Sequence, residues 1–234
     1  MRNTILILST LTFIACGGEK SSNPTPTSQT SQISQMPTSQ TRLIDEDFTL
    51  KLSDVPNYKS SDSIEKQYLS VINYLRSLNV KCNDHLAFQG PAPKLTWNNN
   101  LADASQEHSN DMLSVKKMSH TGSGTSTDLT GQDFTPTRKS HFNERIRFNH
   151  YDYKTSGENV AYIAKYPILE EDAWVQAMEN LMKSKTGHCS NIMNADFKDF
   201  AMAEARGTKN LVFSDGVTRP APAGYWTQNF GALK

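Results

Sequence analysis

The feature that most limits how this chain can fold is a polar tract from residue 17 to about residue 42, dominated by Ser, Thr, Gln and Pro. A segment with almost no apolar residues cannot bury enough surface to offset the conformational entropy lost on ordering. We therefore expect residues 16–45 to form a disordered tether. The 234-residue chain then has room for one folded domain at 60–234, and residues 45–60 are a lead-in whose structure the pattern leaves open.

The segment before this tract has the parts of a secretory signal: Arg2, an apolar run over residues 5–15, and Cys16 followed by Gly17. The run is roughly half the ~20 residues that a membrane-spanning helix needs. Phe13-Ile14-Ala15-Cys16 resembles a bacterial lipobox, which implies removal of residues 1–15 and lipidation of Cys16. An ordinary signal peptide cut nearby is the alternative. We expect an exported lipoprotein anchored by its lipid to the bacterial cell envelope, on an outer membrane if the cell has one, or else a secreted protein.

The charges of the chain are balanced, with 24 Lys and Arg against 24 Asp and Glu. A general nucleic-acid binder needs a basic surplus to release phosphate counterions. We therefore expect no nucleic-acid partner.

The pattern of the domain alternates between helical and strand periods. Apolar residues at helical spacing follow Ser63, and Asn98 is a favoured cap for a second helix. The pattern predicts an α+β domain. Helices are expected over residues 62–78, 98–115, 138–148 and 167–182, strands over 157–163, 200–205 and 225–230, and a loop over 119–136.

Five segments occur in an order typical of one known family: Leu95-Thr96-Trp97-Asn98 with His108-Ser109-Asn110-Asp111-Met112, Ser119-His120-Thr121-Gly122, Gly157-Glu158-Asn159-Val160-Ala161, Gly187-His188-Cys189-Ser190-Asn191, and Tyr225-Trp226-Thr227-Gln228-Asn229-Phe230-Gly231. Together they resemble the CAP superfamily of cysteine-rich secretory, antigen 5 and pathogenesis-related proteins (the SCP-like domain), in its bacterial branch. The resemblance implies a three-layer α-β-α sandwich with a central, mostly antiparallel sheet.

The resemblance also implies a surface cavity lined by two His and two Glu. His120, Glu158 and His188 match three of these positions. At the fourth position this chain has Ala177, three residues after Trp174, where other branches carry Glu. Glu179 or Glu144 is a candidate to take its place.

Imidazoles and carboxylates from separate loops can hold a divalent ion such as zinc, with His120 and His188 as ligands, or perform acid–base chemistry. The alternative is that both His only bind buried loops. The sequence contains no HExxH and no GxSxG motif. His108 lies on the apolar side of a predicted helix and is expected in the core; His85, His141 and His150 are expected at the surface, and the three Trp in the core.

Cys189 beside His188 permits two interpretations. A free, activated thiolate would make it a nucleophile. An exported domain instead favours a disulfide between Cys82 and Cys189, and the resemblance to bacterial CAP proteins implies the same pairing.

Three functions remain open at this point. The first is a binding module that presents the cavity to a lipid, a peptide or a cell-wall component. The second is a hydrolase, such as a metal-assisted peptidase, that uses His120, Glu158 and His188. The third is a structural envelope protein without a working site.

Overall fold

The structure, a computed structural model, describes residues 41–234 of the chain. The predicted signal segment, the lipidation site Cys16 and nearly all of the predicted tether lie outside these residues. Within residues 41–234, no helix has both the length and the apolar character needed to cross a membrane.

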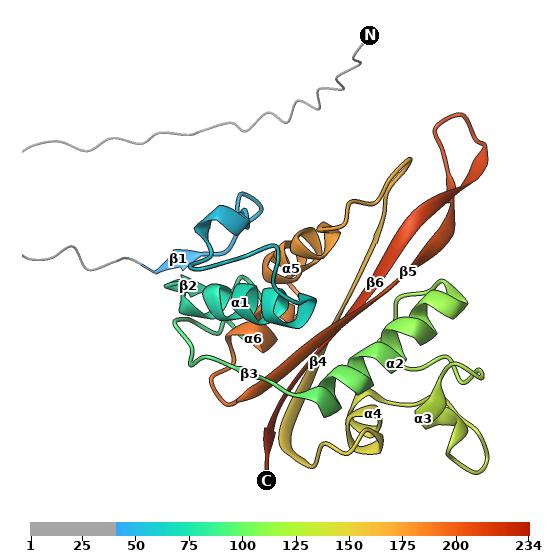
Figure 1. The fold of residues 1–234 in the computed structure, drawn as a ribbon, viewed down its shortest axis with the longest axis horizontal. Coiled ribbons are helices and arrows are strands. Elements are labelled where there is room, and N and C mark those ends of the chain that lie inside the picture. The colour runs from blue at the N-terminus through green and yellow to red at the C-terminus, as the bar shows by residue number, and fades with distance from the viewer. Residues whose placement is uncertain (1–40) are drawn as a thin grey trace, which may run out of the picture. The chain divides into compact units, whose positions relative to one another are not determined.

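A four-stranded sheet forms the middle of the domain (Figure 1). Its strand order is β3 (Thr96–Trp97), β5 (Asp199–Val212), β6 (Thr218–Leu233) and β4 (Tyr153–Ala164). The pairs β5–β6 and β6–β4 are antiparallel, and the short β3 is parallel to β5. Strand β4 is therefore an edge strand. A separate pair, β1 (Arg42–Leu43) and β2 (Val80–Lys81), is parallel.

Helices cover both sides of this sheet (Figure 1). One side carries α1 (Ile64–Ser77), α5 (Ala173–Lys183) and α6 (His188–Met193), which we call the apolar layer. The other carries α2 (Asn99–Val115), α3 (Leu129–Gln132) and α4 (Phe142–Phe148), which we call the polar layer. A short 3-10 helix, η1, spans Leu52–Asp54. The fold is thus the predicted α+β sandwich with a mostly antiparallel sheet.

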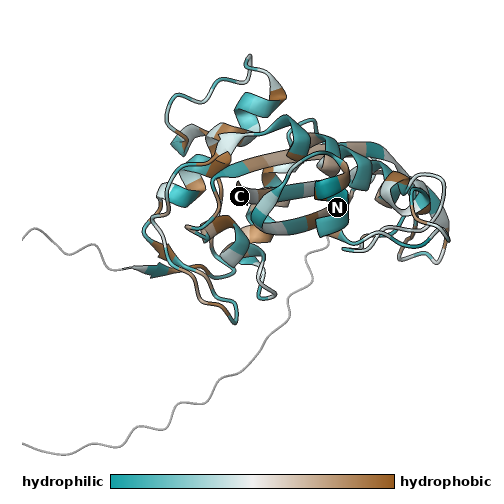
Figure 2. Ribbon diagram, turned by 90° about the horizontal axis from the view of Figure 1, so that it is seen from below, coloured by the Kyte–Doolittle hydropathy of each residue, from teal (hydrophilic) through white to brown (hydrophobic). Residues whose placement is uncertain are grey.

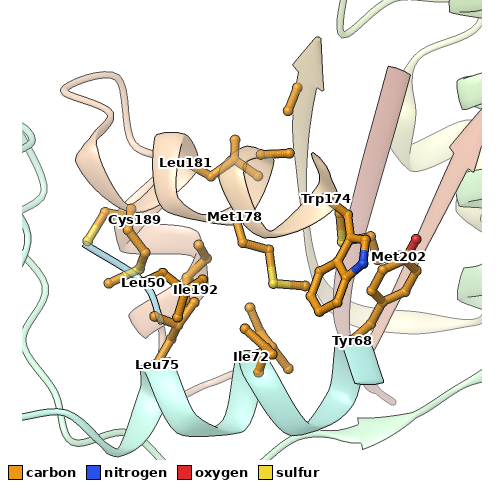
Figure 3. Packing of buried hydrophobic residues seen from close by; sticks show 14 of the residues in the cluster. Leu50, Tyr68, Ile72, Leu75, Trp174, Met178, Leu181, Cys189, Ile192 and Met202 are labelled. Carbon is orange, nitrogen blue, oxygen red and sulfur yellow. The ribbon is translucent and has the colours of Figure 1, made fainter. Parts of the chain in front are cut away.

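The main hydrophobic core lies between the sheet and the apolar layer. Tyr68 and Ile72 of α1 face Trp174 and Met178 of α5, as Figure 3 shows. The Tyr68 and Trp174 rings meet edge to face, with centroids 5.1 Å apart. Individual helices and strands contain both hydrophobic and hydrophilic residues (Figure 2), as expected for elements that bury one side only.

The lead-in segment is part of this core. Ile44, Phe48, Leu50 and Val55 are all buried in the main hydrophobic cluster. The packed domain therefore begins near residue 42, about 18 residues before the predicted start. The apolar residues of this segment have no regular period, so they gave no helix or strand signal.

The predicted elements are present, with shifted ends. Helix α2 starts where expected, because the Asn98 side chain accepts hydrogen bonds from the backbone N–H groups of Asn100 and Leu101. The predicted loop 119–136 contains the one-turn helix α3. Helix α5 starts at Ala173, six residues later than the pattern around Pro167 indicated.

Strands β5 and β6 are much longer than predicted and form a protruding hairpin (Figure 1). Pro220 and Pro222 lie within β6 and break a strand pattern in the sequence. There the ladder with β4 has ended, at Ala223, and just beyond it the Pro222 carbonyl accepts a 3.0 Å hydrogen bond from the Lys165 N–H. A proline, which lacks an N–H donor, is tolerated on such an edge.

The disulfide between Cys82 and Cys189 is present, with Cα atoms 5.6 Å apart and both residues buried. It links the segment after β2 to α6. The interpretation of Cys189 as a free nucleophile is therefore wrong.

Candidate functional site

The predicted site residues His120, Glu158 and His188 lie next to one another beside the edge strand β4. His120 belongs to the loop after α2, Glu158 to β4, and His188 is the first residue of α6. The His120 Nδ1 atom is 3.0 Å from Glu158 Oε1. The ring centroids of His120 and His188 are 5.8 Å apart. The two imidazoles thus come from opposite layers and meet at β4.

The alternation of β4 explains this arrangement. Successive side chains of a strand point to opposite faces. Glu158 contacts Arg145 and His120 in the polar layer, whereas Asn159 binds the His188 carbonyl of the apolar layer through Nδ2, at 3.1 Å. One dipeptide therefore connects the strand to both halves of the site.

Glu158 forms a buried ion pair that sequence reasoning missed. Its Oε2 atom accepts a 2.7 Å hydrogen bond from Arg145 Nη2, and each side chain is 1 % exposed. Burial acts to raise the pKa of Glu158, but Arg145 and the hydrogen bond from His120 outweigh it, so the pKa of this carboxyl is below its usual range. Glu158 is therefore a carboxylate.

Arg145 also fixes the loop that carries His120. Its Nη2 donates to the His120 carbonyl at 3.0 Å, and its Nη1 donates to Ser140 Oγ at 3.0 Å. The sequence predicts only a helix over residues 138–148. Two other arginines of that segment, Arg138 and Arg147, are not buried. Nothing in the local pattern marks Arg145 as the buried one.

The His120 ring is held in one orientation. Because a carboxylate only accepts hydrogen bonds, the contact with Glu158 makes Nδ1 the donor and leaves Nε2 unprotonated in the neutral ring. Among residues 41–234, Nε2 of His120 has no hydrogen-bond partner in the protein, and the side chain is 50 % exposed. A ligand can therefore reach this nitrogen.

Amide side chains hold α6 against β4. Asn191 Nδ2 donates to the Glu158 carbonyl at 3.1 Å and to Asn159 Oδ1 at 2.9 Å, and Asn159 Nδ2 donates to Gln228 Oε1 at 3.1 Å. These amides come from three of the five sequence motifs. The motifs are therefore also the framework that places His188.

A comparison with models of protein families shows to which family this chain belongs. The family model for the cysteine-rich secretory protein family, CAP, matches residues 69–230. This chain belongs to the CAP family. The match includes the first four motifs, the fifth as far as Phe230, the disulfide cysteines and the three predicted site residues.

A solved structure similar to this CAP domain is that of an extracellular protein containing an SCP domain from Bacillus anthracis str. Ames. The identity is 22%, the TM-score is 0.42, and the alignment covers 73% of this chain and 40% of the other. The family membership rests on the match to residues 69–230 and not on this neighbour. No curated protein gives a significant match.

The charged group that pairs with Glu158 at the CAP site is a cation, Arg145. Glu144 pairs with Arg138 and accepts a hydrogen bond from the His141 backbone N–H at 2.8 Å. Glu179 pairs with Lys183 and accepts from the Leu50 backbone N–H at 2.9 Å. Both candidates thus have partners of their own, and among residues 41–234 neither forms a hydrogen bond or ion pair with His120 or His188; which of them fills the fourth position stays a prediction.

His108 lies in the core, as predicted, although its Nδ1 atom has no hydrogen-bond partner among residues 41–234. Its side chain is buried, and Nε2–H donates to the Ser119 carbonyl at 2.6 Å. Burial lowers the pKa of His108, and the charge of Glu158 only partly opposes this. Burial, followed by the proximity of His120, also lowers the pKa of His188.

The donor set does not fit a catalytic zinc site, which takes three protein ligands. In the part of the chain that the structure describes, no group of three or more His, Cys, Asp or Glu side chains is arranged to hold a metal ion. Both Glu158 oxygens already accept hydrogen bonds, from His120 and from Arg145. That leaves two imidazoles, so we derive no metal-dependent step.

Proposed function

We propose that this chain is an exported, lipid-anchored CAP domain of the bacterial cell envelope whose His120–His188 site binds a lipid, peptide or cell-wall ligand. The observation that supports the proposal is the half-exposed His120 ring. Its Nδ1 atom contacts Glu158, which is itself fixed by the buried ion pair with Arg145. A polar group that is exposed but already fixed loses little entropy when a ligand binds it.

The chemistry around the two imidazoles favours binding over covalent catalysis. Cys189 is in a disulfide. Among the described residues, no hydroxyl or thiol forms a hydrogen bond with His120 Nε2, as an activated nucleophile would. A hydrogen-bonding imidazole pair beside a neutralised carboxylate suits recognition of a polar group on a ligand.

The envelope location rests on the apolar run and Cys16, and it has its own test. Growth with a clickable fatty acid should label the wild-type chain, whereas Cys16→Ser should abolish the label and release the protein from membranes. A label that survives Cys16→Ser would contradict the lipid anchor.

The binding site is tested with the full-length chain by native mass spectrometry, first for co-purified ligands and then with a panel of fatty acids, phospholipids, short peptides and peptidoglycan fragments. His120→Ala/His188→Ala should remove the bound species. His150→Asn is the matched control, because His150 is exposed and has a positive φ of 63° that Asn tolerates. If no panel member binds, or if the double variant binds as well as the control, the site does not have this role.

Hydrolysis is a second candidate, favoured by the 3.0 Å contact between His120 and Glu158, which orients the imidazole as a general base would be oriented. It predicts turnover of a bound peptide or ester. His120→Ala should then abolish turnover while circular dichroism shows a folded domain; turnover that is equal in the variant would exclude His120 as the base.

A further inference from the structure

A separate pocket lies beside the loop that carries His120. It has a volume of about 240 Å³, and its lining includes Met112 and Val115 of α2 together with Lys117, Thr121, Thr125 and Lys139. We call it the loop pocket. Thr121 directly follows His120 in the chain, but His120 itself does not line the pocket. The loop pocket is therefore a neighbour of the imidazole site and not a part of it.

Two buried carboxylates hold the wall of the loop pocket in place. Asp111 accepts hydrogen bonds from the Ser123 N–H at 2.7 Å, from Ser123 Oγ at 2.6 Å and from Thr127 Oγ1 at 2.7 Å. Asp128 accepts from the Gly124 N–H at 2.9 Å and the Gly131 N–H at 3.1 Å. A loop with this many fixed donors is pre-organised, so a ligand does not have to order it.

Hydroxyl groups follow one another along this wall at every second residue. Ser119 and Thr121 lie 3.0 Å apart through their hydroxyl oxygens, Ser123 and Thr125 2.7 Å, and Thr125 and Thr127 3.1 Å. Ser123 and Thr127 donate their hydroxyl protons to Asp111, and Thr125 donates to one of these two hydroxyls, so the three oxygens are left mainly as acceptors. Such a surface matches a ligand that donates hydrogen bonds, as the hydroxyls of a polyol or sugar do.

The exposed charged groups of the loop pocket are positive. Lys117 and Lys139 are exposed, and neither forms an ion pair with any residue between 41 and 234. The acidic group in the lining, Asp111, is 2 % exposed and already accepts three hydrogen bonds. Two free ammonium groups at the rim favour an anionic ligand group.

The apolar residues and the volume of the loop pocket limit the kind and size of ligand that it can hold. Met112 is buried and Val115 is 39 % exposed, so part of the lining is apolar and can contact the C–H face of a ring. The volume is below the ~300 Å³ at which pockets for drug-sized ligands begin. One ring or one headgroup fits.

We propose that the loop pocket binds an anionic polyol headgroup, meaning a carboxylated sugar or a phosphorylated polyol. The inference goes beyond the proposed function, because it concerns other residues and would hold if the imidazole pair bound nothing. Envelope glycans and lipid headgroups both carry this chemistry, and the probes below distinguish the two sources.

The test is an NMR titration of the full-length chain, ¹⁵N-labelled and purified in detergent. Glucuronate is compared with glucose, and glycerol 3-phosphate with glycerol. We expect the charged member of at least one pair to shift the amide signals of residues 115–125 and 139, and its neutral partner to have a much weaker effect. The pair that responds identifies a sugar or a phosphate source.

Lys117→Gln/Lys139→Gln should weaken binding of the charged probe about tenfold, since each exposed ammonium contributes modestly and the two add. Lys66→Gln/Lys154→Gln is the control, because it changes the net charge equally at exposed lysines outside the pocket. His150→Asn, at an exposed residue outside the pocket, should leave the affinity for these probes within about twofold. Equal affinity of charged and neutral probes, or an unchanged affinity in Lys117→Gln/Lys139→Gln, would overturn the proposal.

Discussion

The two helical layers contact the same sheet but hold it by different means. In the apolar layer, one large cluster of Leu, Ile, Met and aromatic side chains fills the space between the helices and the strands. In the polar layer the hydrophobic clusters are small, and several charged side chains are buried: Glu107, Asp111, Asp128, Arg145 and Glu158. Packing thus dominates on the apolar side, where the buried Arg76 of α1 donates to the carbonyls of Pro93, Ile192 and Asn194, and specific polar partners dominate on the other side.

The two layers should therefore respond differently to substitution. A hydrophobic cluster of this size can exchange one apolar residue for another of similar volume at modest cost. A buried charge must keep its partner, because an unpaired one is strongly destabilising. The loop pocket and the His120 half of the imidazole site depend on the polar layer, where hydrogen bonds set the positions, whereas His188 belongs to α6 of the apolar layer. The predictions below test this contrast.

The largest effect is expected from Arg145→Met, which leaves the Glu158 carboxylate buried without a counter-charge. Urea unfolding should show a loss of about 3–5 kcal/mol in the free energy of unfolding. Arg138→Met, which breaks the more exposed pair with Glu144, should cost far less. Equal losses in the two variants would mean that the buried pair does not hold the polar layer together.

Removal of the disulfide tests the apolar layer. Cys82→Ala/Cys189→Ala should lower the free energy of unfolding by about 2–4 kcal/mol, mainly because the unfolded chain gains freedom. Thiol counting on denatured, non-reduced wild-type protein should find neither Cys82 nor Cys189 free. A double variant as stable as the wild type would show that packing alone secures this layer.

A smaller effect is expected at the start of α2. Asn98→Ala removes an acceptor for two backbone N–H groups and should cost about 1 kcal/mol. The corresponding residue of α1 in the apolar layer is Ser63, whose side chain forms no capping hydrogen bond, so Ser63→Ala should cost less. Thermal unfolding of both variants gives the comparison. A larger loss of stability in Ser63→Ala than in Asn98→Ala would show that helix caps contribute more in the apolar layer.

The smallest effect concerns pH. Burial lowers the pKa of His108 below its ordinary 6.5, so below that pH the unfolded chain binds a proton that the folded chain does not. This contribution to stability is present above pH 6.5 and is lost as the pH falls towards the folded pKa. The free energy of unfolding should therefore decrease from about pH 7 to about pH 5.5. His108→Gln should flatten that slope; an unchanged slope would assign it to other groups.

Several parts of this structure could be predicted from the sequence. Asn98 as a cap and the alternation around Glu158 depend on local chemistry, which neighbouring residues determine. The meeting of His120, Glu158 and His188 followed from the motif order through the family resemblance. The structure places them together, while their role stays a prediction.

Other parts depend on tertiary contacts that no local pattern encodes. Arg145 is buried only because Glu158 approaches it from a strand 13 residues later in the chain. The lead-in around Phe48 gains its place from packing against α1 and α5, and it has no regular period of its own. The hairpin extends through two prolines because the ladder between β4 and β6 has already ended at Ala223. Each of these needs the fold before it can be inferred.

The loop that the disulfide closes contains all three helices of the polar layer and the edge strand, since α2, α3, α4 and β4 lie between Cys82 and Cys189. A single protease cut anywhere in residues 83–188 would therefore leave two fragments joined by a covalent bond. The nicked chain would migrate as one species on a gel until a reductant separated it. For a protein exposed to extracellular proteases, this bond would keep a damaged molecule in one piece.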